Sequence, residues 1–441
     1  MNGSGWFLSV RLWVTRVYRG VLHHSRKPIS RAAFELLRAL QLAARPFVLL
    51  KIDTVCSSRI GHFLSEYEEV IYQSAAKIDE PRFRNIVFFP QNPCNRYLNS
   101  RVVEQFRQLP STTTIDVGRN PFLRFLALGA SQLRIRYFDG KVTERYYAGP
   151  RTNGGLFHGL NNTPGLSSNK PIPAEPILTL SASEMDEGWA LLEDLGLQRS
   201  RPLICIHVRD NAYLPGLAYH DYRDPPLRGY EDLVRYLLSE GFNVVRTGSV
   251  ANQPMAIDNS AFLDYPFSDI KSDFMDLFMY AACELAVAGS ISGIDFIPVA
   301  FRKPVAICDL RPLFLPTHAA DKSLAIFSLM RWTDTRSILS LAEMSRNIRF
   351  LSEEYTELGI EFVPNTSEEI MGAVKELISR VMENTEADNI SLPRQEEALR
   401  MYLSRFSFPG AQVTQMPDPE SLPIFGRDFL ERHSIDLGLS E

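Results

Sequence analysis

The chain has 441 residues, of which 45% are apolar and 22% are charged. These values exclude a disordered, collagenous or coiled-coil protein and favour a globular chain of enzyme size. The net charge of −5 hides an asymmetry, because residues 1–51 hold nine Lys or Arg against the single acid Glu35. This first segment is therefore +8 and the remainder is −13.

Two absences in the sequence predict the compartment. The five cysteines are odd in number and have no Cys-x-x-Cys spacing, which argues against a disulfide framework or a zinc site and favours a reducing compartment. No apolar run reaches the ~18–20 residues that a membrane-spanning helix needs. Arginines also interrupt the apolar stretch at the N-terminus where a signal peptide would need an unbroken core. We therefore expect a cytoplasmic protein.

Residues 1–45 are predicted to form a basic amphipathic helical segment. At helical spacing, residues 5–22 gather two tryptophans and four valines within an arc of about 100 degrees, with Arg11, Arg16 and Arg19 outside it. This pattern is typical of a helix that lies on the inner face of an anionic membrane. The alternative is that the helix packs on its own body or on a second subunit. A second helix is expected at about 30–44.

An alternating pattern of strands and helices begins after Pro46. We expect a strand at 47–53, a helix from Gly61, a strand at 86–89 and a helix after Asn99, and loops over 110–176. Such alternation predicts a parallel sheet, and residues 46–180 are assigned to an N-terminal α/β lobe.

The same pattern returns from residue 181 and predicts a C-terminal α/β lobe at 181–385. Its expected helices are 182–196, 229–240 with Gly241 at its end, 273–282, one from Gly293, and 367–382 opened by a Thr-Ser-Glu-Glu capping box. Its expected strands are 203–208, 243–246, 262–265, 285–288 and 304–308. Residues 386–441 are assigned to a helical extension. The predicted fold is α/β, with two Rossmann-like lobes and a cleft between them.

Ligands of open α/β sheets lie beyond the carboxyl ends of the strands, so the loops after strands are the first candidate sites. His207 and Arg209 fall on one side of strand 203–208 and Asp210 on the other, with Tyr213 and Arg223 following. The planar fork of Arg209 suits a phosphate group. The alternative is a structural Arg–Asp ion pair at the end of the strand.

The loop after strand 285–288 is the second candidate. Ser290, Ser292 and Gly293 stand where a helix begins, and small residues with free N–H groups there can hold a diphosphate. The alternative is that serine caps the helix with no ligand. Arg246, Gly248 and Asp273 complete the expected donor-binding set. There is no G-x-G-x-x-G or P-loop motif, and we expect no protein-bound metal and no cofactor.

The loop at Asp53–Gly61 is the third candidate. It leads into a helix on which Glu66 follows His62 by four residues and therefore shares its face. His62 is a candidate general base oriented by Glu66, and Asp210 is a reserve candidate for the catalytic set. A structural histidine is the alternative.

At these residues the chain resembles bacterial glycosyltransferases of the two-lobed GT-B type, which are loosely related to fucosyltransferase-like enzymes. The resemblance covers roughly residues 47–380. It rests on Arg59-Ile60-Gly61-His62, His207-Val208-Arg209-Asp210 with Tyr213-Leu214 and Tyr222-Arg223, the segment from Lys271 to Asp276, and Ser292-Gly293 with Pro298 and Pro304. It implies transfer of a sugar from a nucleotide-activated donor, held by the second lobe, during assembly of a surface glycan. Fucosyltransferase-like enzymes commonly have two consecutive arginines where this chain has Arg209 and then Asp210.

The expected partners are thus a nucleotide-activated sugar, a glycan or lipid-linked acceptor, and the membrane surface through residues 5–22, with no nucleic acid. Two other functions fit the same pattern. One is a nucleotide-sugar epimerase of the two-lobed fold, which would have little need of a basic N-terminal helix. The other is a non-catalytic peripheral membrane protein that binds a nucleotide sugar only, because a fold does not establish an activity.

Overall fold

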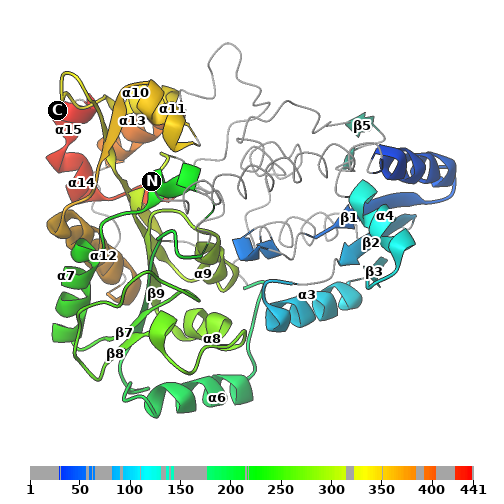
Figure 1. The fold of residues 1–441 in the computed structure, drawn as a ribbon, viewed down its shortest axis with the longest axis horizontal. Coiled ribbons are helices and arrows are strands. Elements are labelled where there is room, and N and C mark those ends of the chain that lie inside the picture. The colour runs from blue at the N-terminus through cyan, green and yellow to red at the C-terminus, as the bar shows by residue number, and fades with distance from the viewer. Residues whose placement is uncertain are drawn as a thin grey trace, which may run out of the picture. The chain divides into compact units, whose positions relative to one another are not determined.

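The computed structural model divides the chain into two compact units, Met1–Pro150 and Arg151–Glu441 (Figure 1). Each unit is described by itself. The described residues are 29, 31–55, 59–61, 63–64, 82–89, 93–109, 111–130, 136–138, 141–143, 176–213, 216, 218–313, 322–349, 351–383, 392–403 and 423–439. The predicted helix at 5–22 lies outside them.

The first unit contains a parallel three-stranded sheet in the order β1-β2-β3. Its strands are β1 Leu49–Thr54, β2 Phe83–Phe89 and β3 Thr112–Asp116. A helix at 31–44 and α4 (Pro121–Ala130) contribute Leu37 and Ala130 to a core with Ile52 and Phe88. The next residue of β2, Phe89, packs edge-on against Phe106 of α3 (Arg96–Gln108) with ring centroids 5.7 Å apart. Successive residues of a strand face opposite sides, so β2 is packed on both faces.

The expectation of loops over 110–176 is wrong for the part of that range that the structure describes. It contains β3, α4 and an antiparallel hairpin of β4 (Arg136–Phe138) and β5 (Lys141–Thr143). Local sequence signals for β3 and α4 are nevertheless present. Three consecutive β-branched threonines favour the strand, and Asn120 caps α4 by accepting from the N–H groups of Phe122 and Leu123 at 2.9 and 3.2 Å.

The second unit contains a seven-stranded sheet in the order β14-β11-β10-β9-β6-β7-β8, and all of its pairs are parallel. From β6 the chain proceeds outward through β7 and β8, then returns to the other side of β6 with β9 and proceeds outward again. The strands are β6 Leu203–Val208, β7 Asn243–Arg246, β8 Phe262–Asp264, β9 Leu285–Gly289, β10 Val305–Leu310, β11 Leu324–Phe327 and β14 Ile424–Phe425. This order confirms an α/β fold and places a topological switch point between β6 and β9.

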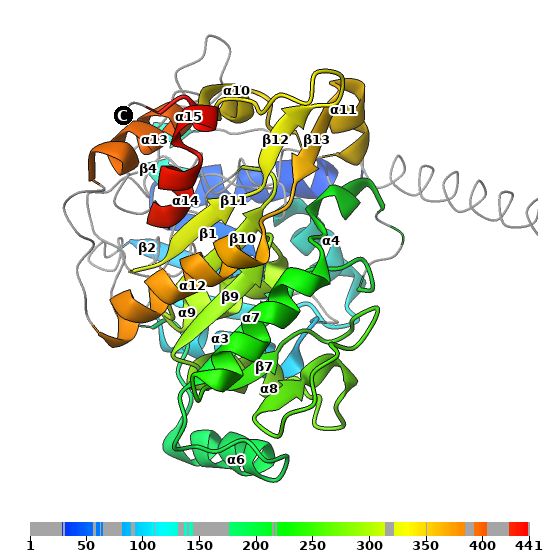
Figure 2. The same cartoon turned by 90° about the vertical axis from the view of Figure 1, so that its left-hand side faces the viewer.

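Helices cover both faces of this sheet. The helices α7 (Leu227–Ser239) and α12 (Ser367–Met382) lie across one face, as Figure 2 shows, and α8 (Met275–Ala282) and α9 (Phe296–Ala300) lie on the other (Figure 1). Outside α8 lies α6 (Ala182–Glu193), whose Trp189 packs edge-on against Phe278. The strands are buried on both sides, which explains their continuous apolar runs.

The remaining elements of the second unit follow β11. Along the chain, β12 (Leu329–Trp332) is followed by α10 (Leu341–Arg346), α11 (Ser352–Glu357) and β13 (Ile360–Val363). The strands β12 and β13 pair with each other in antiparallel orientation. The C-terminal extension contains α13 (Leu392–Leu403), α14 (Arg427–Arg432) and α15 (Ser434–Leu437), and it also supplies the edge strand β14. No helix among the described residues is long and apolar enough to span a membrane.

Several predicted elements of this unit are confirmed, including strands 203–208 and 243–246 and helix 367–382 with its capping box between Thr366 and Glu369. The lobe boundary predicted at residue 180 stays a prediction, because residues 151–175 lie outside the described ranges.

Candidate functional site

The candidate site lies at the carboxyl ends of β6 and β9, on either side of the switch point. Val208 pairs with Gly289 in the sheet, and the N–H of Arg209 donates to the carbonyl of Gly289 at 3.2 Å. The two loops singled out from the sequence are therefore direct neighbours. Adjacent loops that diverge at a switch point leave a crevice for a ligand.

The guanidinium groups of Arg209 and Arg223 are largely buried and lie near each other at the end of β6. Burial lowers the pKa of Arg209 to about 10, and the nearby positive charge of Arg223 adds to this effect against the neighbouring acids. Burial also lowers the pKa of Arg223. The Arg209 guanidinium forms an ion pair with the carboxylate of Asp224. Within the described part of the chain, the buried Nε of Arg223 has no hydrogen-bond partner. A desolvated cation with an unused donor is a group that an anionic ligand can complete.

Arg223 is the last residue of η1 (Ala218–Arg223), and contacts from other segments of the chain hold this short helix in place. Arg311 donates from Nη1 to the carbonyl of Tyr222 at 3.3 Å, and the N–H of Tyr222 donates to Ser352 Oγ at 3.3 Å. The Tyr222 ring stacks on Phe362 with centroids 5.8 Å apart. Two hydrogen bonds thus hold the backbone of Tyr222, and one ring contact holds its side chain, all from distant parts of the chain.

Arg311, which contacts η1, belongs to a buried hydrogen-bond network around Asp309. The sequence interpretation gave Asp309 no role. Its carboxylate accepts hydrogen bonds from Arg311 Nη2 at 3.0 Å, Ser328 Oγ at 2.8 Å, Tyr230 OH at 3.0 Å and the N–H of Asn365 at 2.8 Å. A buried carboxylate is tolerated when it is paired and hydrogen-bonded in this way. The available signal was the Asp-Leu-Arg-Pro sequence at the end of an apolar strand.

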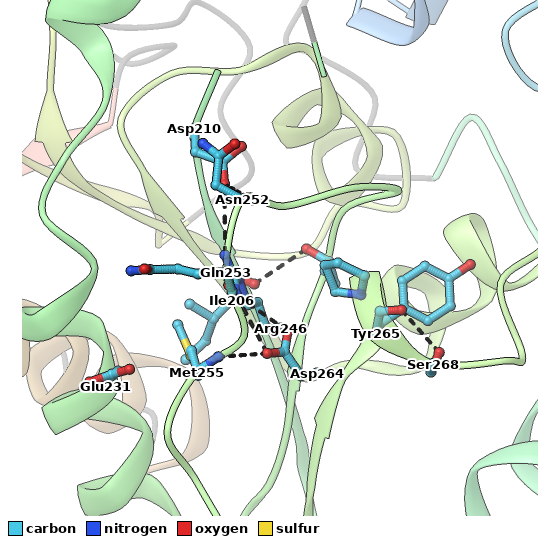
Figure 3. A network of polar contacts seen from close by, with 12 residues as sticks. Ile206, Asp210, Glu231, Arg246, Asn252, Gln253, Met255, Asp264, Tyr265 and Ser268 are labelled. Carbon is cyan, nitrogen blue, oxygen red and sulfur yellow. Dashed lines mark hydrogen bonds and ion pairs between the residues drawn. The ribbon is translucent and has the colours of Figure 1, made fainter. Parts of the chain in front are cut away.

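Asp210 and Arg246 organise the loop that follows β7 (Figure 3). The two carboxylate oxygens of Asp210 accept from the N–H groups of Ala212 at 2.9 Å and Asn252 at 2.8 Å. Arg246, only 2% exposed, donates to the carbonyl of Gln253 at 2.8 Å and lies 3.4 Å from the Asp264 carboxylate. In the described structure both residues are therefore engaged with protein groups, and their predicted catalytic and donor-binding roles stay predictions.

A histidine–carboxylate pair lies at the switch point. His207 Nδ1 is 3.3 Å from Asp295 Oδ1, at ion-pair distance, without the alignment of a hydrogen bond, and the two side chains are 12% and 13% exposed. The other oxygen of Asp295 accepts from the N–H of Ser292 at 2.6 Å and caps η3 (Gly293–Asp295). Asp295 was given no role in the sequence interpretation. An acid three residues after Ser292 is the capping-box signal that could have found it.

The turn at Ser290–Gly293 offers fewer free N–H groups than the sequence suggested. The N–H of Ser290 donates to the Cys308 carbonyl at 2.7 Å, and its buried hydroxyl donates to the Arg311 carbonyl at 3.4 Å. The N–H of Ser292 is taken by Asp295. Ser290 has a φ of 67°, so the turn is sharp. The N–H groups of Ser290 and Ser292 are therefore already engaged with protein groups.

The other predicted site residues are dispersed. Gly248, with a φ of 123°, follows β7, and a Cβ there would lie 3.7 Å from His207 Cδ2, so this glycine adjoins the site. Tyr213 is 57% exposed in the loop after β6, and Asp273 precedes α8. His62 and Glu66 lie outside the described residues, so their assignment as base and orienting acid stays a prediction.

Comparison with solved structures returns sugar-transferring enzymes. A family 9 glycosyl transferase from Veillonella parvula DSM 2008 is 9% identical, with 75% of this chain and 96% of that chain covered and a TM-score of 0.43. The iron-containing heptosyltransferase TibC, solved with ADP-D-beta-D-heptose, is 12% identical, with 77% and 78% covered and a TM-score of 0.30. SnogD from Streptomyces nogalater, also a glycosyltransferase, is 12% identical, with 82% and 77% covered and a TM-score of 0.22.

No protein-family model and no curated protein matches the sequence. Since all three TM-scores are below 0.5, the function of this chain has to be inferred from its own residues.

Proposed function

We propose that the protein is a glycosyltransferase that moves a sugar from a nucleoside-diphosphate donor to a glycan or lipid-linked acceptor. Two observations support it: the order of motifs shared with GT-B enzymes, and the parallel sheet whose switch point lies between the His207–Arg209 and Ser290–Gly293 loops. The observation that carries it is the pair of desolvated guanidinium groups of Arg209 and Arg223 beside that switch point.

The diphosphate of the donor would bind next to these two cations. An anion between them reduces their mutual repulsion and gives the unused Nε of Arg223 an acceptor. Asp224 already pairs with Arg209, so the ligand has to share or displace this carboxylate. When the sugar leaves, negative charge develops on the diphosphate, and fixed cations stabilise it without rearrangement. Because two arginines can supply this charge, we propose a mechanism that needs no metal.

The acceptor hydroxyl has to lose a proton, and we propose His62, oriented by Glu66, as the base. We also propose that the enzyme works in bacterial surface polysaccharide synthesis at the inner face of the cytoplasmic membrane. The basic residues 1–51 and the amphipathic pattern at 5–22 support a peripheral attachment there.

The experiment is donor turnover by Arg209 variants. Thermal-shift screening with UDP-, GDP- and CMP-linked sugars first identifies a donor that stabilises the folded protein. Arg209→Ala should then lower transfer by about 10²- to 10³-fold, as expected for loss of one electrostatic stabiliser of the transition state. Arg209→Lys should not restore full activity, because an ammonium group cannot reproduce the bidentate fork.

The matched control is Arg199→Ala, which removes an exposed arginine paired with Asp186 on the surface and should change neither activity nor the melting temperature. Wild-type turnover by Arg209→Ala would overturn the diphosphate assignment. Release of a free 2-epimer would indicate the epimerase, and binding of the donor without turnover would indicate a non-catalytic protein.

A further inference from the structure

A series of ring contacts connects Arg311 to Arg223. The Arg311 guanidinium lies over the ring of Phe362, 5.4 Å from its centroid. The ring of Tyr222 stacks on the same Phe362 with centroids 5.8 Å apart and an interplanar angle of 21°. The guanidinium of Arg223 lies over the Tyr222 ring, 5.9 Å from its centroid. Contacts of a guanidinium with an aromatic face at this distance are attractive, so the Tyr222 ring contributes to the placement of the Arg223 side chain.

Arg311 is held in three directions by the protein. Its Nε donates to Ser328 Oγ at 2.6 Å, and its Nη2 donates to Asp309 Oδ1 at 3.0 Å. The third nitrogen, Nη1, donates to the carbonyl of Tyr222 at 3.3 Å. Arg311 is only 5% exposed and Asp309 is fully buried. Because the planar fork of Arg311 is fixed by its other two contacts, its hydrogen bond to Tyr222 is directional.

Arg311 also contacts the second loop of the candidate site. Its carbonyl accepts from the hydroxyl of Ser290 at 3.4 Å. Ser290 and Asp309 both have left-handed backbones, with φ of 67° and 51°. For residues other than glycine this conformation persists only where the surrounding structure enforces it, and such positions cluster at functional sites. Arg311 therefore links the loop after β9 to η1.

Arg311 and Arg223 differ in how completely the protein satisfies them. Each of the three guanidinium nitrogens of Arg311 has a partner. Within the part of the chain that the structure describes, the buried Nε of Arg223 has no hydrogen-bond partner. The difference indicates that Arg311 has a supporting role, whereas Arg223 is available to a ligand.

We infer that Arg311 and Tyr222 are positioning residues for Arg223: Arg311 fixes the backbone of Tyr222, and the Tyr222 ring orients the Arg223 guanidinium for binding of an anion beside Arg209. The inference rests on the proposed diphosphate site. The two residues act through Arg223, because a side chain that is already ordered loses less conformational freedom when a ligand binds.

The first test is binding of inorganic pyrophosphate to the full chain, measured by isothermal titration. Tyr222→Leu should weaken the affinity about 5-fold, the effect expected when one long side chain is no longer ordered in advance. Tyr222→Phe keeps the ring and should bind as wild type does. Arg311→Lys should weaken the affinity about 3-fold, since an ammonium group can still pair with Asp309 but cannot reach three partners as the planar fork does.

Arg235→Lys is the matched control. Arg235 also lies between a carboxylate and a main-chain carbonyl, Asp232 at 3.3 Å and Ala256 at 3.0 Å, but it is on the exposed side of α7. The same substitution there should leave the pyrophosphate affinity unchanged.

The second test is a double-mutant cycle with Arg223→Met. If Tyr222 and Arg311 act through Arg223, then Tyr222→Leu and Arg311→Lys cause no further loss of pyrophosphate affinity in the Arg223→Met background. With a donor identified by thermal shift, Arg311→Lys should also raise the KM for donor about 3-fold and leave the KM for acceptor unchanged.

Wild-type pyrophosphate affinity in both Tyr222→Leu and Arg311→Lys would overturn the inference. Losses that recur in full in the Arg223→Met background would assign the two residues a purely structural role and would overturn it as well. Should Arg311→Lys fail to fold, the Tyr222 variants decide alone, and equal affinity of Tyr222→Leu and Tyr222→Phe would refute the positioning role.

The proposed function fails separately, if Arg209→Ala binds pyrophosphate and turns over donor as wild type does. If Arg209→Ala and Arg223→Met lose pyrophosphate binding while Tyr222→Leu and Arg311→Lys keep it, only the positioning role is refuted.

Discussion

Arg223 illustrates at the scale of single residues how a candidate site can be costly for stability. Its guanidinium is desolvated, it lies close enough to Arg209 to lower the pKa of that group, and its Nε has no partner in the described structure. Burying a charge that is incompletely paired is unfavourable, and replacement by an apolar residue of similar volume is often neutral or stabilising. Such a residue is explained more easily by a ligand than by the fold.

We therefore predict that Arg223→Met keeps or raises the melting temperature while weakening pyrophosphate binding by about 10-fold. The apolar side chain removes both the desolvation cost and the repulsion with Arg209, yet it cannot donate to an anion. Calorimetric unfolding and titration with pyrophosphate measure the two effects on one sample. A variant that is clearly destabilised and binds normally would show that Arg223 serves the fold.

At the scale of elements, the contact between α6 and α8 depends on the absence of a side chain at Gly188. An ideal Cβ at this position would lie 2.2 Å from Cδ2 of Phe278, a fully buried ring. In a helix interior alanine is favoured over glycine by about 1 kcal/mol. Overpacking a tight core typically costs about 1–3 kcal/mol, and a ring this close cannot remain in place.

Gly188→Ala should therefore lower the free energy of unfolding by about 1–2 kcal/mol, against the direction of helix propensity. Gly372→Ala in α12 is the matched control, because the atom nearest to its Cβ is Asp428 Oδ2 at 3.9 Å. The control should be neutral or stabilising by up to about 1 kcal/mol. Urea unfolding measures the change in the free energy of unfolding for both variants. Equal changes in the two would contradict the packing argument.

The start of α12 is tied to α14 and α15 through Glu369. Burial on its own raises the pKa of Glu369, but hydrogen bonds from His433 at 2.5 Å and from the N–H of Thr366 at 2.7 Å outweigh it and lower the pKa below its ordinary 4.5. A carboxyl group with a lowered pKa contributes stability above its ordinary pKa, and this contribution is lost as pH falls through the folded value.

Glu369→Gln should thus lose about 1–3 kcal/mol of unfolding free energy at pH 7, and the difference from wild type should shrink as pH falls below 4.5. Glutamine can still accept from Thr366, so mainly the charged contact with His433 is removed. Exposed Glu368, paired with Arg432, provides the control Glu368→Gln, expected to be near neutral. A difference that stayed constant from pH 7 to pH 4 would contradict the linkage.

At the scale of the whole molecule, the charge asymmetry predicts where the protein works. Anionic headgroups attract basic residues at about 1 kcal/mol each near the surface, and residues 1–51 have a charge of +8. Full-length protein should co-sediment with liposomes in proportion to their anionic lipid content, and a version beginning at Pro46 should not. The binding should weaken with added salt, because surface charges are screened within about 8–10 Å at physiological ionic strength.

The packing alternative for this segment gives a different result. A helix that packs on its own body or on a second subunit would leave the full-length protein indifferent to anionic lipid. Equal binding by the protein that begins at Pro46 would likewise show that the attachment lies elsewhere.

The sequence by itself determined several local elements of the second unit, although it predicted none of the elements between β10 and α12. Apolar runs bounded by turn residues predicted β6 and β7 to the residue, and the capping box predicted α12 to the residue. It also predicted that the loops after β6 and β9 carry the chemistry, and this stays a prediction. In the first unit it missed β3 and α4, although their threonine run and their Asn120 cap are local signals.

Only the tertiary structure decided which side chains meet. Hydrophobic periodicity predicts strands but not their order in a sheet. The adjacency of β6 and β9 and the switch point between them therefore could not be predicted from the sequence. The same holds for the pairs His207–Asp295, Arg209–Asp224 and Asp309–Asn365, whose members come from separate elements. Periodicity fixes which face of an element is buried. Residues that are distant in sequence decide whether a polar group at the end of an element has a hydrogen-bond partner within the protein or is left for a ligand.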